Sequence, residues 1–204
     1  IEAWGNELLD KPIENRQGAD TYWGGKSMLR TVQAFNMAWQ LQLPIAEPLY
    51  QEAKRVTEDW LIYEPGEKAF YYAKYPLPWS GVVGFNPSYG SEQFTDNHFH
   101  YGYLAMSAAL IGMHDPLWLQ KYGPTVRNIV KQYEEWERDS SIYPRLRTFE
   151  CWAGHSYAGG MSSGYDGNNQ ESSSEAVGSW AGMFFLGAVL GDEDMLAAGA
   201  MGYA

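Results

Sequence analysis

The sequence predicts an all-α protein, an (α/α) toroid built from helical hairpins. Two helical patterns alternate along its 204 residues. Segments that are apolar on every side predict buried helices, and segments with one apolar stripe predict amphipathic helices that cover them. An inner ring of helices surrounded by an outer ring produces this alternation, and about three hairpins are present. No residue period repeats, so the prediction rests on the hydrophobic pattern alone.

The expected elements follow in order along the chain. The residues up to Lys26 are polar, and we expect them to be irregular. Pro44 ends the first helix, and the Gly123-Pro124 pair is expected to break the fourth, because proline cannot donate a helical hydrogen bond. The expected buried helices span about 27–43, 99–113 and 171–190, and the expected amphipathic helices span about 47–63, 117–138 and 193–203.

Two long loops, 64–95 and 139–169, interrupt the helical pattern. Within the first loop, the aromatic stretch 70–75 and the stretch 79–85 predict a short β-hairpin. Loops longer than about fifteen residues are uncommon in compact domains unless they are functional. Each of these loops leads into the N-terminus of an expected buried helix. We therefore expect the candidate functional residues to gather at one end of the toroid.

The charge balance excludes several classes of partner. The chain has 14 Lys and Arg against 25 Asp and Glu, a net charge of −11. Nucleic acids and anionic membranes both need a positive face, so we expect neither as a partner. The single cysteine, Cys151, excludes an internal disulfide, and no charge-free apolar run is long enough to cross a membrane. The nine Trp and fifteen Tyr suit stacking on sugar rings, although most are expected in the core.

Two glutamates open the third buried helix. Glu171 and Glu175 are four residues apart, so on a helix they share one face and repel each other. The unpaired N–H groups and the macrodipole at a helix N-terminus favour such anions and would keep both ionised. Ser172-x-x-Glu175 also matches a capping box, in which the glutamate has only a structural role. Capping and chemistry are equally consistent with this spacing.

A third carboxylate, Asp96, precedes the second buried helix. It can cap that helix, but Phe94, Phe99 and Tyr101 flank it and can exclude water from its side chain. Desolvation and nearby glutamates both raise the pKa of a carboxyl group. A neutral acid that faces an ionised base is the division of roles that glycosidases use.

The histidines suggest two further hypotheses for the kind of site, a metal site and a nucleophilic serine. Asp96-x-His98-x-His100 together with His155 has the residue types of a zinc site, but the spacing matches no known zinc signature, so we expect no metal. A nucleophilic Ser156 activated by His155 is disfavoured, because adjacent side chains cannot easily face each other. No G-x-S-x-G elbow is present to expose the serine.

Several motifs together resemble one known family. The strongest are FTDNHFHYGY at 94–103, GHS at 154–156 and DGNNQESSSEA at 166–176. Weaker ones are YWGGK at 22–26, Phe70-Tyr-Tyr-x-Lys74 and Asp115-Pro-x-Trp118. In this combination and order, which covers most of the chain, they resemble glycoside hydrolase family 81, the endo-β-1,3-glucanases. Glu150 departs from the aspartate expected at its position.

The resemblance implies an N-terminal β-sandwich domain, absent from this sequence, and a C-terminal (α/α)6 barrel. Residues 1–204 would then be part of a single α/α-barrel catalytic domain, about half of the barrel, and a fragment, since the chain begins at Ile1. The implied function is hydrolysis of internal β-1,3-glucosidic bonds with inversion, without metal or cofactor. The implied partner is β-1,3-glucan, and the implied location is extracellular.

Site residues follow from the same resemblance. Asp96 would be the general acid and Glu175 the general base. Glu171 would orient the attacking water or hold up the pKa of Asp96. The residues expected to contact substrate are Tyr22, Lys26, His98, His100, His155, Asp166 and Asn168.

Two alternatives remain open from the sequence. A non-catalytic glucan-binding module could use the same aromatic groove, and Asp96→Asn would leave its function intact. Another α/α-toroid enzyme, such as a polysaccharide lyase, would leave an unsaturated product that absorbs in the ultraviolet. The negative charge of the chain disfavours the acidic polysaccharides on which a lyase acts.

Overall fold

The computed structural model describes residues 1–11, 20–62, 73–74, 81–160 and 169–204. Within these ranges the protein is mainly helical, which confirms the predicted all-α class. Its three helical hairpins are α3 (Trp23–Gln40) with α4 (Ala46–Glu58), α5 (Asn97–His114) with α6 (Pro116–Tyr133), and α7 (Ser173–Leu190) with α8 (Glu193–Tyr203).

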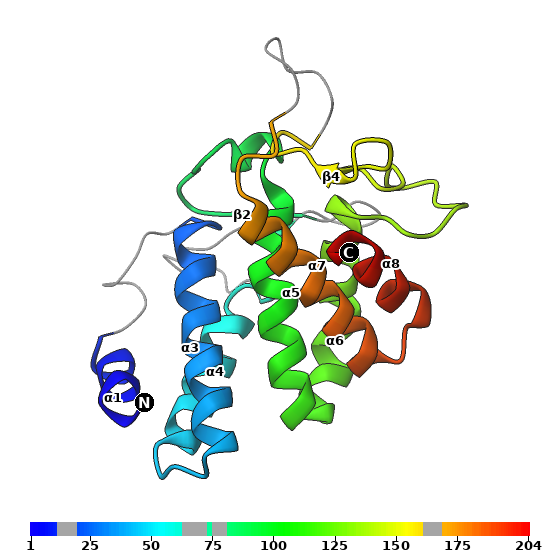
Figure 1. The fold of residues 1–204 in the computed structure, drawn as a ribbon. Helices are drawn as coiled ribbons and strands as arrows, with labels where there is room; N and C mark the ends of the chain where they lie inside the picture. Colours follow the sequence, from blue (N-terminus) through cyan, green and yellow to red (C-terminus); the bar gives the residue numbers. More distant parts are fainter. Residues whose placement is uncertain (12–19, 63–72, 75–80, 161–168) are drawn as a thin grey trace.

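The hairpins form two layers. Helix α5 lies between α3 and α7 in the inner layer, while α4, α6 and α8 each pack on their own hairpin partner (Figure 1). This arrangement confirms the predicted alternation of inner and outer helices. Almost all of α5 is buried, because helices pack on both of its sides and behind it. Glycines let α5 and α7 approach closely: a Cβ on Gly102 would lie 2.5 Å from the Cβ of Ser179.

The expectation that the first 26 residues are irregular is wrong. Helix α1 (Glu2–Asp10) occupies the start of the chain. Its apolar side packs against α4 and the residue before it: a Cβ on Gly5 would lie 3.0 Å from side-chain atoms of both Ile45 and Leu49. Helix α3 also begins earlier than expected, because Asp20 Oδ1 accepts hydrogen bonds from the first N–H groups of this helix.

The break predicted at Gly123-Pro124 is also wrong. Helix α6 continues through Pro124 and ends at Tyr133. Pro124 is exposed, so water can satisfy the carbonyl group that loses its helical partner. Gly123 serves packing instead, since a Cβ there would lie 2.7 Å from the side chain of Leu190 in α7.

Two small antiparallel hairpins and one 3-10 turn complete the described elements. Strands β1 (Ala73–Lys74) and β2 (Val82–Val83) pair as the sequence predicted. Strands β3 (Phe149–Glu150) and β4 (His155–Ser156) form a second hairpin that the sequence did not predict. The turn η1 (Ser91–Gln93) precedes α5. None of the helices described here is long and apolar enough to span a membrane.

The N-termini of α3, α5 and α7 point to the same end of the molecule (Figure 1). Hydrogen bonds tie the preceding segments together there. The Asp96 N–H donates to the Ala158 carbonyl, and the Ala158 N–H donates to the Asn169 carbonyl, both at 2.7 Å. Thr21 Oγ1 lies 2.7 Å from His100 Nδ1. The loops therefore meet at one end of the inner layer, as the sequence predicted.

Candidate active site

A cavity of about 180 Å³ opens at this end of the inner layer. It receives side chains from the starts of α3, α5 and α7 and from the loops before them. Its lining residues are Tyr22, Tyr89, Asp96, Phe99, His100, Glu171 and Glu175. The structure thus brings together three carboxylates that are separated by up to 79 residues in the sequence.

Asp96 sits at the N-terminus of α5 with its backbone in the left-handed region, at φ 57°. A non-glycine residue in this conformation is uncommon and is a frequent feature of functional sites. The side chain of Asp96 makes no capping hydrogen bond to the helix, although the sequence allowed one. The carboxyl group is therefore available to the cavity.

The environment of Asp96 favours the neutral acid. Burial raises its pKa, and the negative charges of Glu171 and Glu175 raise it further, to about 7. The sequence predicted both causes, a dry environment and repulsion by glutamates. Below neutral pH, Asp96 therefore carries a proton that it can donate.

Glu175, in the first turn of α7, has the opposite protonation state. Its Oε1 accepts hydrogen bonds from the Tyr103 hydroxyl group and forms an ion pair with Lys26 Nζ at 2.9 Å. Partial burial raises the pKa of Glu175, but the hydrogen bonds from Tyr103, Lys26 and Ser172 lower it, to about 2. The predicted capping box does not form, since the Ser172 side chain makes no cap bond and Glu175 faces the cavity.

Glu171 differs from the expectation that it lies on the same helical face as Glu175. Helix α7 begins at Ser173, so Glu171 precedes it. Its φ is 62°, and its N–H donates to Asn169 Oδ1 at 2.8 Å. This left-handed turn points the exposed Glu171 carboxylate to the cavity from the loop.

Tyr22 and Lys26 are both at the cavity end of α3, but they differ in position. Tyr22 lines the cavity directly. Lys26 contacts Glu175 instead: its Nζ donates to the Tyr22 hydroxyl at 2.6 Å and lies 2.9 Å from Glu175 Oε1. Its charge is therefore paired with Glu175. Lys26 also lines the adjoining cavity of about 500 Å³, so the predicted substrate contact stays a prediction.

His98 and His100 of α5 are both fully buried. His100 lines the cavity. Burial lowers its pKa to about 4, so the ring is neutral at neutral pH. His98 lies in the core against Phe99 and Trp180, with ring centroids 4.0 and 6.3 Å away. The substrate contact predicted for His98 does not fit this position, because no part of the side chain reaches a surface.

His155 lies outside the cavity. His155 is in β4, where its Nδ1 lies 2.9 Å from the Ser156 carbonyl oxygen. Glu150 of β3 accepts a hydrogen bond from the Trp152 N–H at 3.0 Å, which holds the tip of that hairpin. Asp166 and Asn168 lie outside the described residues.

Two further tyrosines at the site, Tyr103 and Tyr89, were not among the residues predicted from the sequence. Tyr103 is in the second turn of α5, and its hydroxyl group donates to Glu175 at the cavity. Burial and the hydrogen bond to Glu175 raise the pKa of Tyr103, so its hydroxyl stays a donor. Tyr89 comes from the loop before α5, and no residue pattern in that loop indicated that its side chain reaches the cavity.

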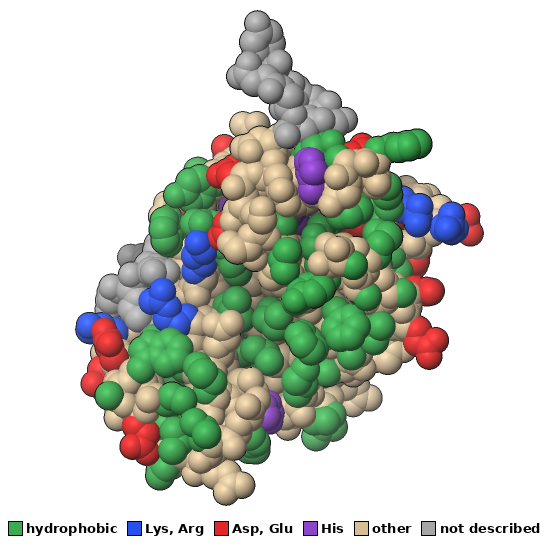
Figure 2. All heavy atoms as spheres, viewed as in Figure 1, with side chains coloured by type: hydrophobic (Ala, Val, Ile, Leu, Met, Phe, Trp, Pro, Cys, Tyr) green, Lys and Arg blue, Asp and Glu red, His purple; other side chains and the backbone are tan. Residues whose placement is uncertain are grey.

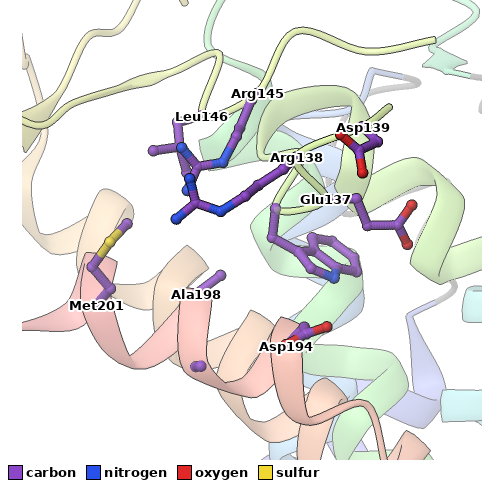
Figure 3. Close-up of a pocket in the computed structure, with 10 residues that line it drawn as sticks. Glu137, Arg138, Asp139, Arg145, Leu146, Asp194, Ala198 and Met201 are labelled. Carbon is purple, nitrogen blue, oxygen red and sulfur yellow. The ribbon is translucent and has the colours of Figure 1, made fainter. Parts of the chain in front are cut away.

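Two other cavities do not contain both Asp96 and Glu175. One, of about 650 Å³, lies between α8 and the segment after α6, where Arg138 and Arg145 run side by side (Figure 3). It contains none of the predicted site residues. The other, of about 500 Å³, continues from Glu175 along α3, α5 and α7. No group of three or more potential metal ligands occurs among the residues that the structure describes.

Comparison with known proteins gives a consistent result. The family model described as the glycosyl hydrolase family 81 C-terminal domain matches residues 2–204. A glucan endo-1,3-beta-D-glucosidase of Acetivibrio thermocellus is 37% identical over 197 residues, which are 92% of this chain and 25% of the relative. The protein of that name from Thermobifida fusca is 37% identical over 182 residues, 87% of this chain and 24% of the relative.

A solved structure shows the same fold. It is a mutant of a glycoside hydrolase family 81 protein from Clostridium thermocellum, with a TM-score of 0.84 and 34% sequence identity. The similarity covers 99% of this chain and 28% of that one. The chain therefore spans about a quarter of the length of the relatives it matches.

Proposed function

The chain belongs to glycoside hydrolase family 81, and from this premise we propose that it forms part of an enzyme that hydrolyses internal β-1,3-glucosidic bonds. The observation that carries the proposal is the cavity lined by both Asp96 and Glu175. One carboxyl group there has its pKa raised to about 7, and the other has its pKa lowered to about 2. Two carboxylates with opposite protonation states are what acid–base hydrolysis of a glycoside requires.

In the proposed reaction, neutral Asp96 gives its proton to the glycosidic oxygen as the bond between C1 and this oxygen breaks. Ionised Glu175 takes a proton from a water molecule, whose oxygen forms a bond to C1 from the opposite face. The two events yield a sugar with inverted configuration at C1 and an alcohol leaving group. The next cycle needs only a proton transfer from Glu175 back to Asp96 through solvent.

The neighbours of Glu175 would set its geometry. Tyr103 and Lys26 both contact Oε1. They fix the rotation of the carboxylate, so that Oε2 is the oxygen we assign to the attacking water. These contacts also make Glu175 a weaker base, because both of them favour its ionised form. Glu171, in its left-handed turn, would orient the same water and repel the charge of Asp96.

We further propose that residues 1–204 form part of a larger α/α barrel that carries this site. Figure 2 shows hydrophobic side chains across the face formed by α3, α5 and α7. Large apolar side chains such as Trp39 of α3 and Phe185 of α7 are exposed. An apolar cavity of about 360 Å³ also opens beside α7 and α8. Contiguous exposed apolar surface indicates contact with further protein, here the next helices of the barrel.

The proposed substrate is β-1,3-glucan, because relatives with the same domain are named glucan endo-1,3-beta-D-glucosidases. We also propose that the enzyme acts outside the cell. This proposal is supported by a Schizosaccharomyces pombe relative that matches 61% of this chain and is named a primary septum glucan endo-1,3-beta-D-glucosidase. The proposed chemistry uses only side chains of the protein.

The test is turnover of a linear β-1,3-glucan by the whole protein and by its Asp96→Asn variant. We expect the wild type to release oligosaccharides of several lengths, as internal cleavage does. Asp96→Asn should lose at least about a hundredfold in rate, the usual contribution of a general acid, while it still binds the glucan. Full activity of Asp96→Asn, or products that absorb in the ultraviolet as a lyase produces, would exclude the proposed reaction.

A further inference from the structure

We propose that Tyr89 is the residue on which a glucosyl ring stacks at the cleavage site, and that a strained turn holds its side chain in position for this contact. The inference rests on the proposed function, because it takes β-1,3-glucan as the ligand. Nothing in the motifs that carry the family resemblance includes Tyr89. The position of its ring in the cavity carries the inference.

Tyr89 combines exposure with a place in the cavity. Its side chain lines the same cavity as Asp96 and Glu175, yet the residue is 55% exposed. More than half of this large aromatic side chain is open to solvent beside the proposed catalytic carboxylates, so its ring is accessible to a ligand. The apolar face of a pyranose ring is a natural partner for such a side chain, because C–H groups stack on aromatic faces.

A second tyrosine fixes the orientation of this ring. The rings of Tyr22 and Tyr89 are 4.7 Å apart between centroids, with an interplanar angle of 67°. This edge-to-face pair forms two walls of the cavity that meet at an angle. Tyr22 is held in turn by Lys26, whose Nζ lies 4.2 Å from the ring centroid. The Lys26–Glu175 ion pair thus links the tyrosine pair to the proposed base.

The backbone of Tyr89 is in the left-handed region, at φ 49°. A bulky residue there is a conformational outlier that costs free energy, and glycine would avoid this cost. The next residue, Gly90, has φ 74°, and a Cβ there would collide with Thr95 Oγ1 at 2.1 Å. A tyrosine at the strained position therefore indicates a use for the side chain that offsets the cost.

Hydrogen bonds keep the turn in this shape. Thr95 Oγ1 donates to the Tyr89 carbonyl oxygen at 2.8 Å. Ser88 Oγ donates to Asp20 Oδ1 at 2.8 Å, and the same oxygen accepts the N–H groups at the start of α3. The loop is therefore anchored on both sides of Tyr89. An aromatic ring that is held before binding loses little conformational entropy when the sugar arrives.

The test measures binding and stability separately, in the whole protein with Asp96→Asn as the non-cleaving parent. Titration calorimetry with a linear β-1,3-linked glucose oligomer gives the affinity. We expect Tyr89→Ala to weaken binding about tenfold, which is about 1.4 kcal/mol. Tyr89→Phe keeps the ring and should bind within about threefold of the parent. Leu117→Ala removes a large apolar side chain that is 78% exposed at the start of α6, outside the cavity, and serves as the control.

Tyr89→Gly separates a binding role from a structural one. Glycine relieves the left-handed strain, so its thermal midpoint should equal or exceed that of the parent while its affinity falls as in Tyr89→Ala. A residue needed only for the fold would lower the midpoint and leave the affinity unchanged.

Two results would overturn the inference while the proposed function stands. One is unchanged affinity in Tyr89→Ala. The other is a loss in Tyr89→Phe as large as in Tyr89→Ala, which would assign the contact to the hydroxyl group. Absence of any glucan binding by the parent would contradict the proposed function itself.

Discussion

Because the pKa of Asp96 is raised, we predict that Asp96→Asn stabilises the protein, but only above about pH 4. The carboxyl group has a pKa of about 7 when folded, against its model value of 3.8. A shift of about three units corresponds to about 4 kcal/mol at most. Asp96 is only partly buried, and solvent screens its charge, so we expect about half of this, about 2 kcal/mol. Asparagine resembles the neutral acid and avoids the penalty.

The sign of the pH dependence follows from the direction of the shift. Below about pH 4, Asp96 is protonated in both the folded and the unfolded state, so it carries no penalty and the variant gains nothing. As the pH rises from about 4 to about 7, the unfolded state loses its proton more readily than the folded state. The difference between variant and wild type should therefore grow over this range and stay constant above it.

The assay is thermal unfolding at several pH values. A gain of about 2 kcal/mol raises the midpoint of a domain of 150–250 residues by about 4–8 °C. Glu175→Gln is the matched control with the opposite sign, because the pKa of Glu175 is lowered, to about 2, and its contacts stabilise the fold at neutral pH. Equal midpoints for wild type and Asp96→Asn at pH 8, or a gain that persists at pH 3, would refute the assignment of a buried, repelled acid.

Three further predictions concern the proposed base, Glu175, and the fold. Lys26→Met removes the ion pair with Glu175, in which Nζ and Oε1 are 2.9 Å apart. Because a charged hydrogen bond is worth about 1.5–3 kcal/mol, the apparent pKa of the acidic limb of the pH–rate profile should rise by about one to two units. An unchanged acidic limb would contradict the role of Lys26 in keeping Glu175 ionised. Azide should partly restore turnover of an activated β-glucoside in Glu175→Ala, giving the inverted α-azide, but not in Glu171→Ala; rescue confined to Glu171→Ala would reverse the two roles. Gly102→Ala should lower the free energy of unfolding by about 1–3 kcal/mol, because its Cβ would lie 2.5 Å from Ser179. Gly178→Ala is the control, since a Cβ there would have no atom of another described element within 4 Å. Equal thermal midpoints for the two variants would contradict the packing described for α5 and α7.

The sequence predicted the helical layers because their signal is local. The segment that became α5 is apolar on every side, and the segment that became α4 has one apolar stripe. The errors arose where distant packing overrides local preference. Nothing near Gly123-Pro124 shows that Leu190 of α7 needs the space that glycine leaves.

The candidate site, like the fold, could be predicted only in part from the sequence. Asp96 and Glu175 occur within motifs, so a resemblance identified them. The environment of Asp96 could be inferred from its aromatic neighbours, but that of Glu175 could not. Its ionisation depends on Tyr103 and Lys26, which are 72 and 149 residues away in the sequence. The same applies to Tyr89, whose backbone conformation and contact with Tyr22 are set by tertiary structure.

The most direct test of the proposed mechanism is the anomeric configuration of the first product. Proton NMR during the first minutes of β-1,3-glucan hydrolysis by the whole protein distinguishes the two anomers before they equilibrate. Attack by a water held at Glu175, on the face opposite Asp96, predicts that the new reducing end appears as the α-anomer. Initial release of the β-anomer would show retention, and Glu175 could then not be the base that activates water.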